Sequence, residues 1–472
     1  MPAYRPARPA VVPRFGSRFD RREILQTAFA GAVAMGSFRG LSALGADPVS
    51  SDWLMVEQID RTAVQVPYRE TPARAMAREL PHWQYSEIVE VTLKSGQTGF
   101  GETLLYYSWG TTNDDDVTRA LGKNAAEILW DDSFGPGLQI ALFDAVAKTY
   151  GVPVHALLGT RQVDRTPLSW WNIDMPPEDM AEECAEALKQ GYMSYKTKGR
   201  PWFDLWKQVE LSTKVVPEAF KIDMDFNDTL LDAERAIPIL LELEKYPQVD
   251  IWEGPIPQKD VAGNRKICDA VRGKVALHYG DPRPIDVLRA DAADGFVVGG
   301  GATTLMQTGA VCEMADKPFW LQLVGTGVTA AWSLHFGAVL KQAKWPAVNC
   351  HQLYQHSLLA EPIVVKEGLA AVPSKPGLGY ELDRDALQKL RIKKLKARPE
   401  PERLLETTWP DGRTMYVASN GSVNFMLTVG MKAQMPYFER GVNTRLVPND
   451  GSEKWKSLYQ KAQKEPYFPK GA

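Results

Sequence analysis

The sequence predicts an α/β protein: a (β/α)-barrel of the modified TIM type, preceded by an α+β capping domain. Two observations support this fold class. Strand-like and helix-like stretches alternate from residue 165 onward, which is typical of a parallel sheet wound with helices. Polar side chains also recur at the predicted strand ends about every 28 residues, the length that one strand, one helix and two short loops require. Since barrel active sites lie at the C-terminal ends of the strands, we expect these polar groups to share one site.

Length and composition limit the classes of function. The chain has 472 residues, 44% of them hydrophobic and 24% charged, which are ordinary values for a globular protein of this size. The net charge of −3 argues against a nucleic-acid partner, which usually needs a basic surplus. The four cysteines lie far apart without the spacing of a zinc site, so we expect isolated buried thiols: Cys184, Cys268, Cys312 and Cys350.

Residues 1–46 have the pattern of an export signal. The pair Arg21-Arg22 precedes a mildly apolar stretch at 24–38, and small residues at 43–46 follow as a possible cleavage site. This order resembles a twin-arginine signal and predicts a periplasmic or exported protein. The alternative is an amphipathic N-terminal helix or arm. No segment is long and apolar enough to predict a membrane span.

The rest of the chain divides into three predicted parts. Residues 53–164 predict an α+β capping domain, or lid, with strands at 88–94 and 99–103 and a helix at 137–148. Residues 165–395 predict the catalytic barrel, with eight strands at 168–172, 193–198, 220–225, 249–253, 275–280, 295–298, 319–323 and 347–350. Residues 396–472 form a C-terminal extension without an assigned role, for which we expect strands packed on the barrel or on a partner subunit.

Two lysines end the second barrel strand. Lys196 and Lys198 are two residues apart, so the alternation of a strand points both ammonium groups to one side. Neighbouring lysines lower each other's pKa, as a lysine base working near neutral pH requires. Such a pair alone is usually a solvated strand edge, but here evenly spaced acids follow it.

Asp225, Glu253 and Asp281 each lie at a predicted strand end beside turn residues, 28 residues apart. Three carboxylates at one barrel mouth would repel one another unless a cation joined them, and hard oxygen ligands favour Mg²⁺. Each acid alone could instead be a helix N-cap. The place of Asp281 could also be taken by His278 or by a water. The remaining polar groups near the strand ends are auxiliary candidates: Asn227, His278, Gln322 and His351.

This ordered set of motifs resembles the enolase superfamily, in its mandelate racemase and muconate-lactonizing branch. The resemblance runs from about residue 53 to residue 390. It rests on Lys-x-Lys at 196–198, Asp-x-Asn at 225–227, Glu-x-Pro at 253–255 and Pro-Gly-Leu-Gly at 376–379. Each motif is modest, but their order is specific.

The resemblance implies a role for each residue and a common chemical step. Asp225, Glu253 and Asp281 would bind Mg²⁺, Lys198 would remove the α-proton of a small carboxylate, and Lys196 would help to neutralise the substrate's carboxylate. Removal of the proton gives an enolate held by the metal, whose charge stabilises the enolate oxygen. The resemblance also suggests a symmetric homo-oligomer.

The sequence departs from this family on the far side of the barrel. The family usually has a second acid/base there, either a lysine on strand six or a histidine paired with an aspartate on strands six and seven. Here residues 294–301 contain no lysine, and Gln322 lies where the histidine is expected. Racemisation needs two opposed bases, so a simple racemase is disfavoured. His351, beside Asn349, could supply an acid or could be structural.

These observations lead to three hypotheses. The first is a Mg²⁺-dependent lyase (a dehydratase) or isomerase (cycloisomerase or racemase-like) acting on a small carboxylate such as an acid sugar. The second is a barrel that has lost turnover with its second acid/base and only binds a metal and a carboxylate. The third is a barrel hydrolase with a carboxylate pair, whose activity would survive chelator and the loss of Lys198.

Overall fold

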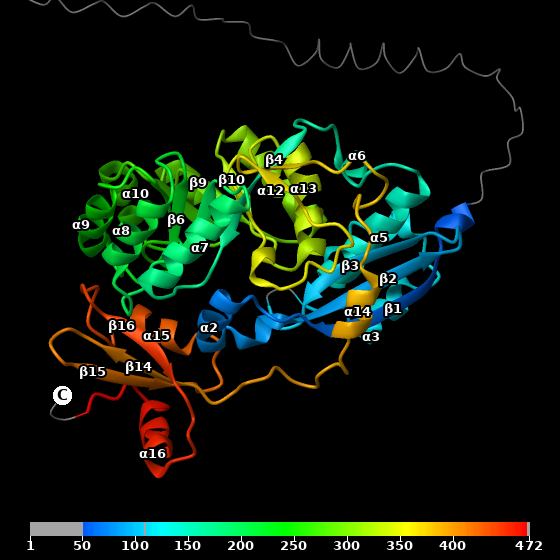
Figure 1. Ribbon diagram of the computed structural model, residues 1–472. Coiled ribbons are helices and arrows are strands. Elements are labelled where there is room, and N and C mark those ends of the chain that lie inside the picture. The colour runs from blue at the N-terminus through cyan, green and yellow to red at the C-terminus, as the bar shows by residue number, and fades with distance from the viewer. Residues whose placement is uncertain (1–50, 108–109, 470–472) are drawn as a thin grey trace, which may run out of the picture. The chain divides into compact units, whose positions relative to one another are not determined.

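The computed structural model describes residues 51–107 and 110–469. The export signal predicted for residues 1–46 lies outside the described residues and stays a prediction. The described chain begins with an antiparallel sheet and its helices. A parallel barrel comes next, and a second antiparallel sheet lies near the C-terminus (Figure 1). Within the described ranges, no helix combines the length and the apolar composition needed to cross a membrane.

The first sheet has the strand order β1-β2-β3, with β1 at Val56–Gln65, β2 at Tyr85–Leu93 and β3 at Thr98–Leu104. The sequence predicts β2 and β3 but not β1, whose apolar residues do not alternate regularly. The other elements of this region are η2 (Ser51–Leu54), α2 (Glu70–Glu79), η3 (Pro81–Gln84), α3 (Asp114–Ala120), α4 (Ala125–Ile128), η4 (Asp132–Phe134), α5 (Gly135–Thr149) and α6 (His155–Leu158).

Two glycines let α5 lie directly on β3. A Cβ atom at Gly99 would come within 2.2 Å of the Ala141 carbonyl oxygen, and one at Gly101 within 2.1 Å of the Gly137 carbonyl oxygen. Any larger residue would therefore push the helix off the sheet. The helix predicted at 137–148 is confirmed as α5, and its packing explains the glycines in the neighbouring strand.

Eight parallel strands form the barrel and confirm the predicted fold class. They are β4 (Arg165–Trp171), β5 (Ser194–Lys198), β6 (Lys221–Asp225), β7 (Val249–Glu253), β8 (Lys274–His278), β9 (Gly295–Val298), β10 (Phe319–Leu321) and β11 (Ala347–Val348). Neighbours pair in order from β4 to β10, β11 pairs with β4, and a parallel bridge between Gln322 and Val348 links the two ends of the sheet. Each predicted strand matches one of these within a few residues.

Helices connect the strands and cover the barrel (Figure 1). They are α7 (Pro177–Lys189), α8 (Leu205–Val215), α9 (Ala233–Leu243), α10 (Val261–Ala270), α11 (Pro284–Ala290), α12 (Ala302–Met314) and α13 (Gly327–Val339). After the last strand come η5 (His351–Leu353), β12 (Val365–Lys366), β13 (Leu369–Ala371) and α14 (Arg384–Leu390), with β13 antiparallel to the start of β4.

The repeat of about 28 residues is also set by helix caps. Asp204, Asp232 and Asp260 are the N-caps of α8, α9 and α10, and their side chains accept hydrogen bonds of 2.9, 2.9 and 2.8 Å from backbone N–H groups in the first turns. Such caps satisfy N–H groups that have no partner inside the helix. Asp225 and Glu253 lie at the ends of strands and cap no helix. The capping aspartates and the strand-end acids are therefore two different groups of residues.

Glu102 of β3 fixes the first sheet to the barrel. Its buried carboxylate accepts hydrogen bonds from the N–H of Thr326 at 2.9 Å and from the hydroxyl of Thr329 at 2.9 Å, at the N-terminus of α13. A helix N-terminus favours a negative charge and offers unpaired N–H groups. Glu102 therefore holds the segment that follows β3, including Tyr107, over the end of the barrel.

Residues 396–469, here called the C-terminal segment, form a small antiparallel sheet with two helices. The elements are β14 (Leu404–Thr408), β15 (Thr414–Ala418), α15 (Phe425–Met431), β16 (Asn443–Val447) and α16 (Glu453–Ala462). Its apolar core includes Trp202 and Phe203, which follow β5 of the barrel. The segment thus packs on the barrel of its own chain, one of the two arrangements that the sequence leaves open.

Candidate active site

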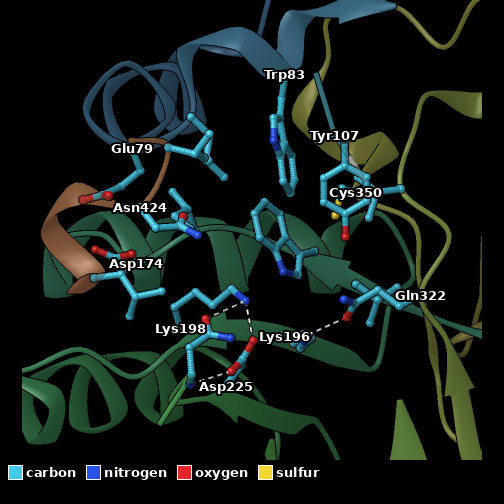
Figure 2. Close-up of a pocket in the computed structure, with 18 of the residues that line it drawn as sticks. Glu79, Trp83, Tyr107, Asp174, Lys196, Lys198, Asp225, Gln322, Cys350 and Asn424 are labelled. Atoms are coloured by element: carbon cyan, nitrogen blue, oxygen red, sulfur yellow. Dashed lines mark hydrogen bonds and ion pairs between the residues drawn. The ribbon is translucent and has the colours of Figure 1, made fainter. Parts of the chain in front are cut away.

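A cavity of about 410 Å³ opens at the C-terminal ends of the barrel strands (Figure 2). Three parts of the chain line it: the strand ends, the region around α2 and β3, and the C-terminal segment. Lys196, Lys198 and Asp225 lie at its base, as the sequence predicts. Pockets at this end of a parallel barrel are the usual place of its active site.

Lys196 is locked in place beneath the cavity. Its side chain is 1% exposed and forms an ion pair with Glu253, with Asp225 Oδ2 at 3.9 Å. It also donates to Gln322 Oε1 at 2.9 Å and lies 5.1 Å from the centre of the Trp320 ring. Burial lowers the pKa of Lys196, but the charges of Glu253 and Asp225 outweigh burial, so the pKa is raised above its ordinary value.

Lys198 is the more exposed of the two lysines that line the cavity. Its side chain is 14% exposed, forms an ion pair with Asp225 and donates to Asn227 Oδ1 at 3.2 Å. Burial lowers the pKa of Lys198 below its ordinary value, and the nearby charge of Lys196 acts in the same direction against that of Asp225. The two lysines of one strand therefore differ in exposure and in the direction of their pKa shifts.

Asp225 lies at the base of the cavity, and Glu253 is buried opposite it on the neighbouring strand. Asp225 Oδ1 accepts the N–H of Asn227 at 2.7 Å, which fixes the carboxylate. Glu253 Oε1 lies 2.9 Å from His278 Nε2, yet neither oxygen of Glu253 accepts a hydrogen bond of good geometry. Burial raises the pKa of Glu253, but Lys196 and His278 together bring it below its usual range.

The structure does not bring Asp281 to this site. Its side chain is 74% exposed and lies 3.3 Å from Lys259, in the loop after β8. The last residue of β8 is His278, which lines the cavity next to Glu253. The sequence prediction assumes that the 28-residue spacing between strand-end carboxylates continues after Glu253. It misplaces Asp281, because β8 ends 25 residues after Glu253 rather than 28.

Within the described residues, the strand ends on the far side of the cavity carry no second lysine or carboxylate. Gln322, after β10, is held between Lys196 and Tyr107 and offers a neutral amide. Gly299 follows β9, where the sequence shows no lysine. His351 lies outside the cavity, with its Nε2 atom 3.0 Å from the hydroxyl of Tyr192, and burial lowers its pKa to about 4. Its position is that of a structural histidine.

Several lining residues were not among the predicted site residues. Arg200 is buried and donates to Asn227 Oδ1 at 2.5 Å, and its place two residues after Lys198 continues the alternation that identifies the lysines. Trp83 of the lid stacks on Trp171 at 5.5 Å between ring centres. Trp83 lies in a distant part of the chain with no motif around it.

The residues present partly fit a divalent cation. In the part of the chain that the structure describes, no three His, Cys, Asp or Glu side chains are grouped as they stand so that they could hold a metal ion, and ammonium groups lie against both buried carboxylates. The donor chemistry does fit: Asp225 and the unbonded oxygens of Glu253 are hard ligands, and the imidazole of His278 lies beside them. Asp281 is not part of this donor set.

Comparison with known proteins agrees with the fold. The family model described as "Enolase C-terminal domain-like" matches residues 179–386, which contain β5 to β11 and the strand-end residues discussed above. A solved structure of 2-chloromuconate cycloisomerase from Rhodococcus opacus 1CP shares the fold with a TM-score of 0.59 at 18% identity, over 72% of this chain and 100% of that one.

Curated relatives are similar over most of the same region. Muconate cycloisomerase 1 of Rhodococcus opacus is 25% identical over 343 residues, covering 64% of this chain and 89% of that protein. D-gluconate dehydratase of Thermoproteus tenax is 24% identical over 305 residues, covering 58% of this chain and 59% of that protein. Two other relatives are named as an epimerase and a dehydratase, so these four names are those of lyases and isomerases. Residues 179–386 therefore match the enolase C-terminal domain-like model, and over most of the same region the chain is similar to muconate cycloisomerase 1 and D-gluconate dehydratase.

Proposed function

We propose that this enzyme removes the α-proton of a small carboxylate with Lys198 as the base, and that elimination of water or a cycloisomerisation follows. One observation carries the proposal: of the two lysines that end β5, Lys198 opens to the cavity, whereas Lys196 is 1% exposed and held by its neighbours. A base must reach the proton that it removes, and geometry comes before pKa in choosing it.

Lys196 supports this step as a fixed positive charge. Its ion pair with Glu253 and its hydrogen bond to Gln322 hold the ammonium group in one position. When the α-proton leaves, negative charge grows on the substrate's carboxylate, and a preoriented cation stabilises that charge without rearranging. Lys196 is therefore a positioning and electrostatic group in this proposal, and Lys198 is the group that exchanges a proton.

One lysine is sufficient for both proton transfers of an elimination. The Cα–H bond breaks as the proton moves to the Nζ atom of Lys198, and the electron pair forms the Cα–Cβ double bond. The Cβ–O bond breaks, the departing hydroxyl takes the proton from Lys198, and water leaves. Lys198 returns to its neutral form, so the step needs no oxidant, reductant or second base.

A divalent cation such as Mg²⁺ would be held by Asp225, Glu253 and His278 in this proposal. When bound, such a cation supplies Lewis acidity to the substrate's carboxylate. The imidazole of His278 in place of a third carboxylate also suits Mn²⁺ or Zn²⁺, because imidazole binds these ions well. Asp281 is not proposed as a ligand, because it is exposed and lies beside Lys259.

We infer an acid sugar as the substrate class. The cavity combines the lysines with further polar groups, among them Asn227 and Asn424, and with the stacked pair of Trp83 and Trp171. The hydroxyl groups of a sugar need hydrogen-bond partners, whereas its C–H groups pack on aromatic rings. The relatives named D-gluconate dehydratase and arabinonate dehydratase support this class. An exported homo-oligomer stays a prediction.

Exchange of the α-proton tests the proposal. The full chain is incubated in D₂O with Mg²⁺ and a panel of aldonates and other small carboxylates, and deuterium at the α-carbon is followed by NMR. We expect exchange in the wild type and a loss of about 10²- to 10⁴-fold in Lys198→Ala, the usual contribution of a general base. The matched control is Lys207→Ala, a partly exposed lysine of α8. Unchanged exchange in Lys198→Ala would refute the role of Lys198.

A binding protein without turnover is the second candidate. It is favoured by the ion pairs that tie each lysine to a buried carboxylate, and by the absence of a second base among the described strand ends. Binding of a carboxylate, seen by calorimetry, with no exchange across the panel would support this candidate over the first.

A further inference from the structure

The C-terminal segment forms part of the cavity wall. Val423, Asn424 and Leu427, at the start of α15, line the cavity together with Glu79 of α2. Figure 2 shows Glu79, Asn424 and Asp174 on one side of the cavity and Gln322 on the other. The enolase family model ends at residue 386, before this segment begins. The wall is therefore an addition of this chain to the part that the family model matches.

Arg403 holds this wall against the lid. Its side chain is 2% exposed, and Nη1 donates to the carbonyl oxygens of Arg78 at 3.1 Å and Glu79 at 3.0 Å, at the C-terminal end of α2. Its guanidinium group also lies 4.9 Å from the centre of the Phe425 ring of α15. Helix C-terminal carbonyls have no partner inside the helix, and a cation is favoured there. These contacts fix helix α2 of the lid to the C-terminal segment.

A second tie connects the segment to the barrel. The hydroxyl of Thr444 on β16 donates to the carbonyl oxygen of Trp202 at 3.0 Å, and the Trp202 indole N–H donates to Asp174 Oδ2 at 2.7 Å. Asp174 and Trp202 both line the cavity. The position of Asn424 relative to Asp174 is therefore set by packing on both sides.

This end of the cavity has polar atoms that have no hydrogen-bond partner in the described protein. Asp174 is 1% exposed, and its Oδ1 atom accepts no hydrogen bond, with Arg200 Nε at 3.9 Å as an ion-pair neighbour. Within the described residues, the side-chain amide of Asn424 has no hydrogen-bond partner, and Figure 2 shows it among the residues around the cavity. A buried acceptor without a donor is costly unless something supplies one.

We propose that Asn424 and Asp174 form a hydroxyl-binding subsite that selects long polyhydroxylated carboxylates. A hydroxyl group donates one hydrogen bond and accepts others, so it can satisfy the Asp174 oxygen and the Asn424 amide together. The inference rests on the proposed function in one respect: the substrate's carboxylate lies at Lys196 and Lys198. The chain of hydroxyls then extends toward the C-terminal segment.

The experiment compares ligands that share a carboxylate end but differ in length. Calorimetry of the full chain with Mg²⁺ measures binding of a panel of six-carbon aldonates that differ in hydroxyl configuration, and of D-glycerate, which lacks the distal hydroxyls. The variant is Asn424→Ala, and the matched control is Asn420→Ala, an exposed asparagine of the same segment that does not line the cavity.

We expect the wild type to bind its best aldonate more tightly than D-glycerate. Asn424→Ala should weaken that aldonate by about three- to tenfold, the size of one lost hydrogen bond, and leave D-glycerate unchanged. Asn420→Ala should change neither. Equal binding of aldonates and D-glycerate by the wild type, or an equal loss for both ligands in Asn424→Ala, would overturn the subsite. Since calorimetry compares ligand affinities and deuterium exchange reports proton removal, failure of the Lys198 mechanism would be seen separately, in the exchange experiment.

Discussion

The two sides of the cavity differ in charge and in packing. On the side of β5, β6 and β7, two lysines and two carboxylates lie in ion-pair contact, and Lys196, Asp225 and Glu253 are each 1% exposed. On the side of β8, β9 and β10, the strand ends carry His278, Gly299 and the neutral Gln322. His278 is 46% exposed. One side is a fixed array of charges, and the other is open and neutral apart from one histidine.

This difference supports the proposal that the reaction takes place on one face of the substrate. A buried array of paired charges is expensive to assemble, but once assembled it does not need to reorganise during the reaction. A racemase needs a second base facing the first, and the described strand ends of the open side supply no lysine or carboxylate for it. Elimination or cycloisomerisation, in which the proton leaves and returns on the same side, agrees with this layout.

The largest predicted loss of unfolding free energy comes from removing a charge on the charged side of the cavity. Lys196→Met leaves Glu253 buried without its ion-pair partner, and removing one partner of a buried ion pair costs about 3–5 kcal/mol of unfolding free energy. Gln322→Leu on the other side removes one hydrogen bond to Lys196 and should cost about 1 kcal/mol. Urea unfolding of both variants measures the difference. Equal losses would contradict the contrast between the two sides.

A second prediction concerns cation binding near His278, where the charged side and the neutral side of the cavity meet. A cation present at 100 times its Kd should stabilise the wild type by about 2.7 kcal/mol, because it binds the folded state only. His278→Ala should lose most of this gain, whereas Asp281→Ala should keep it, since Asp281 is exposed beside Lys259. Thermal unfolding with Mg²⁺, Mn²⁺ and EDTA provides the measurement. If Asp281→Ala lost the gain and His278→Ala kept it, our ligand assignment would be wrong.

A separate prediction concerns two buried histidines behind the cavity. Burial lowers the pKa of His335 in α13 from 6.5 to about 3, and the buried neighbour His155 shifts in the same direction. The unfolded chain binds the proton first as pH falls, so stability is present above about pH 6.5 and is lost toward pH 3, at no more than about 1.4 kcal/mol per pH unit for one histidine. His335→Asn should flatten this slope in urea unfolding at several pH values, and an unchanged slope would contradict the assignment.

Much of the charged side could be predicted from sequence because its parts are local. Lys196 and Lys198 lie on one short strand, and Asp225 and Glu253 end the next two strands, at spacings set by one strand and one helix each. The alternation of strands fixes on which side the lysines point, so a linear pattern is sufficient. The eight barrel strands were found for the same reason.

The rest of the site depends on contacts that no local pattern encodes. Asp281 was misplaced because the 28-residue period, which the caps Asp204, Asp232 and Asp260 follow, does not extend to the end of β8. Asn424 reaches the cavity only because Arg403 and Thr444 dock the C-terminal segment on the lid and on the barrel. Such long-range packing leaves no motif around the residues that it brings together.

The stereochemical course of exchange tests the central claim most directly. Each configuration at the α-carbon of an exchanging substrate is incubated in D₂O, and the recovered substrate is analysed for deuterium and for configuration. Our account predicts deuterium in one configuration only, with that configuration retained, because Lys198 removes and returns the proton on one face. Deuterium in the product of inverted configuration would reveal a second base on the open side and would contradict the account.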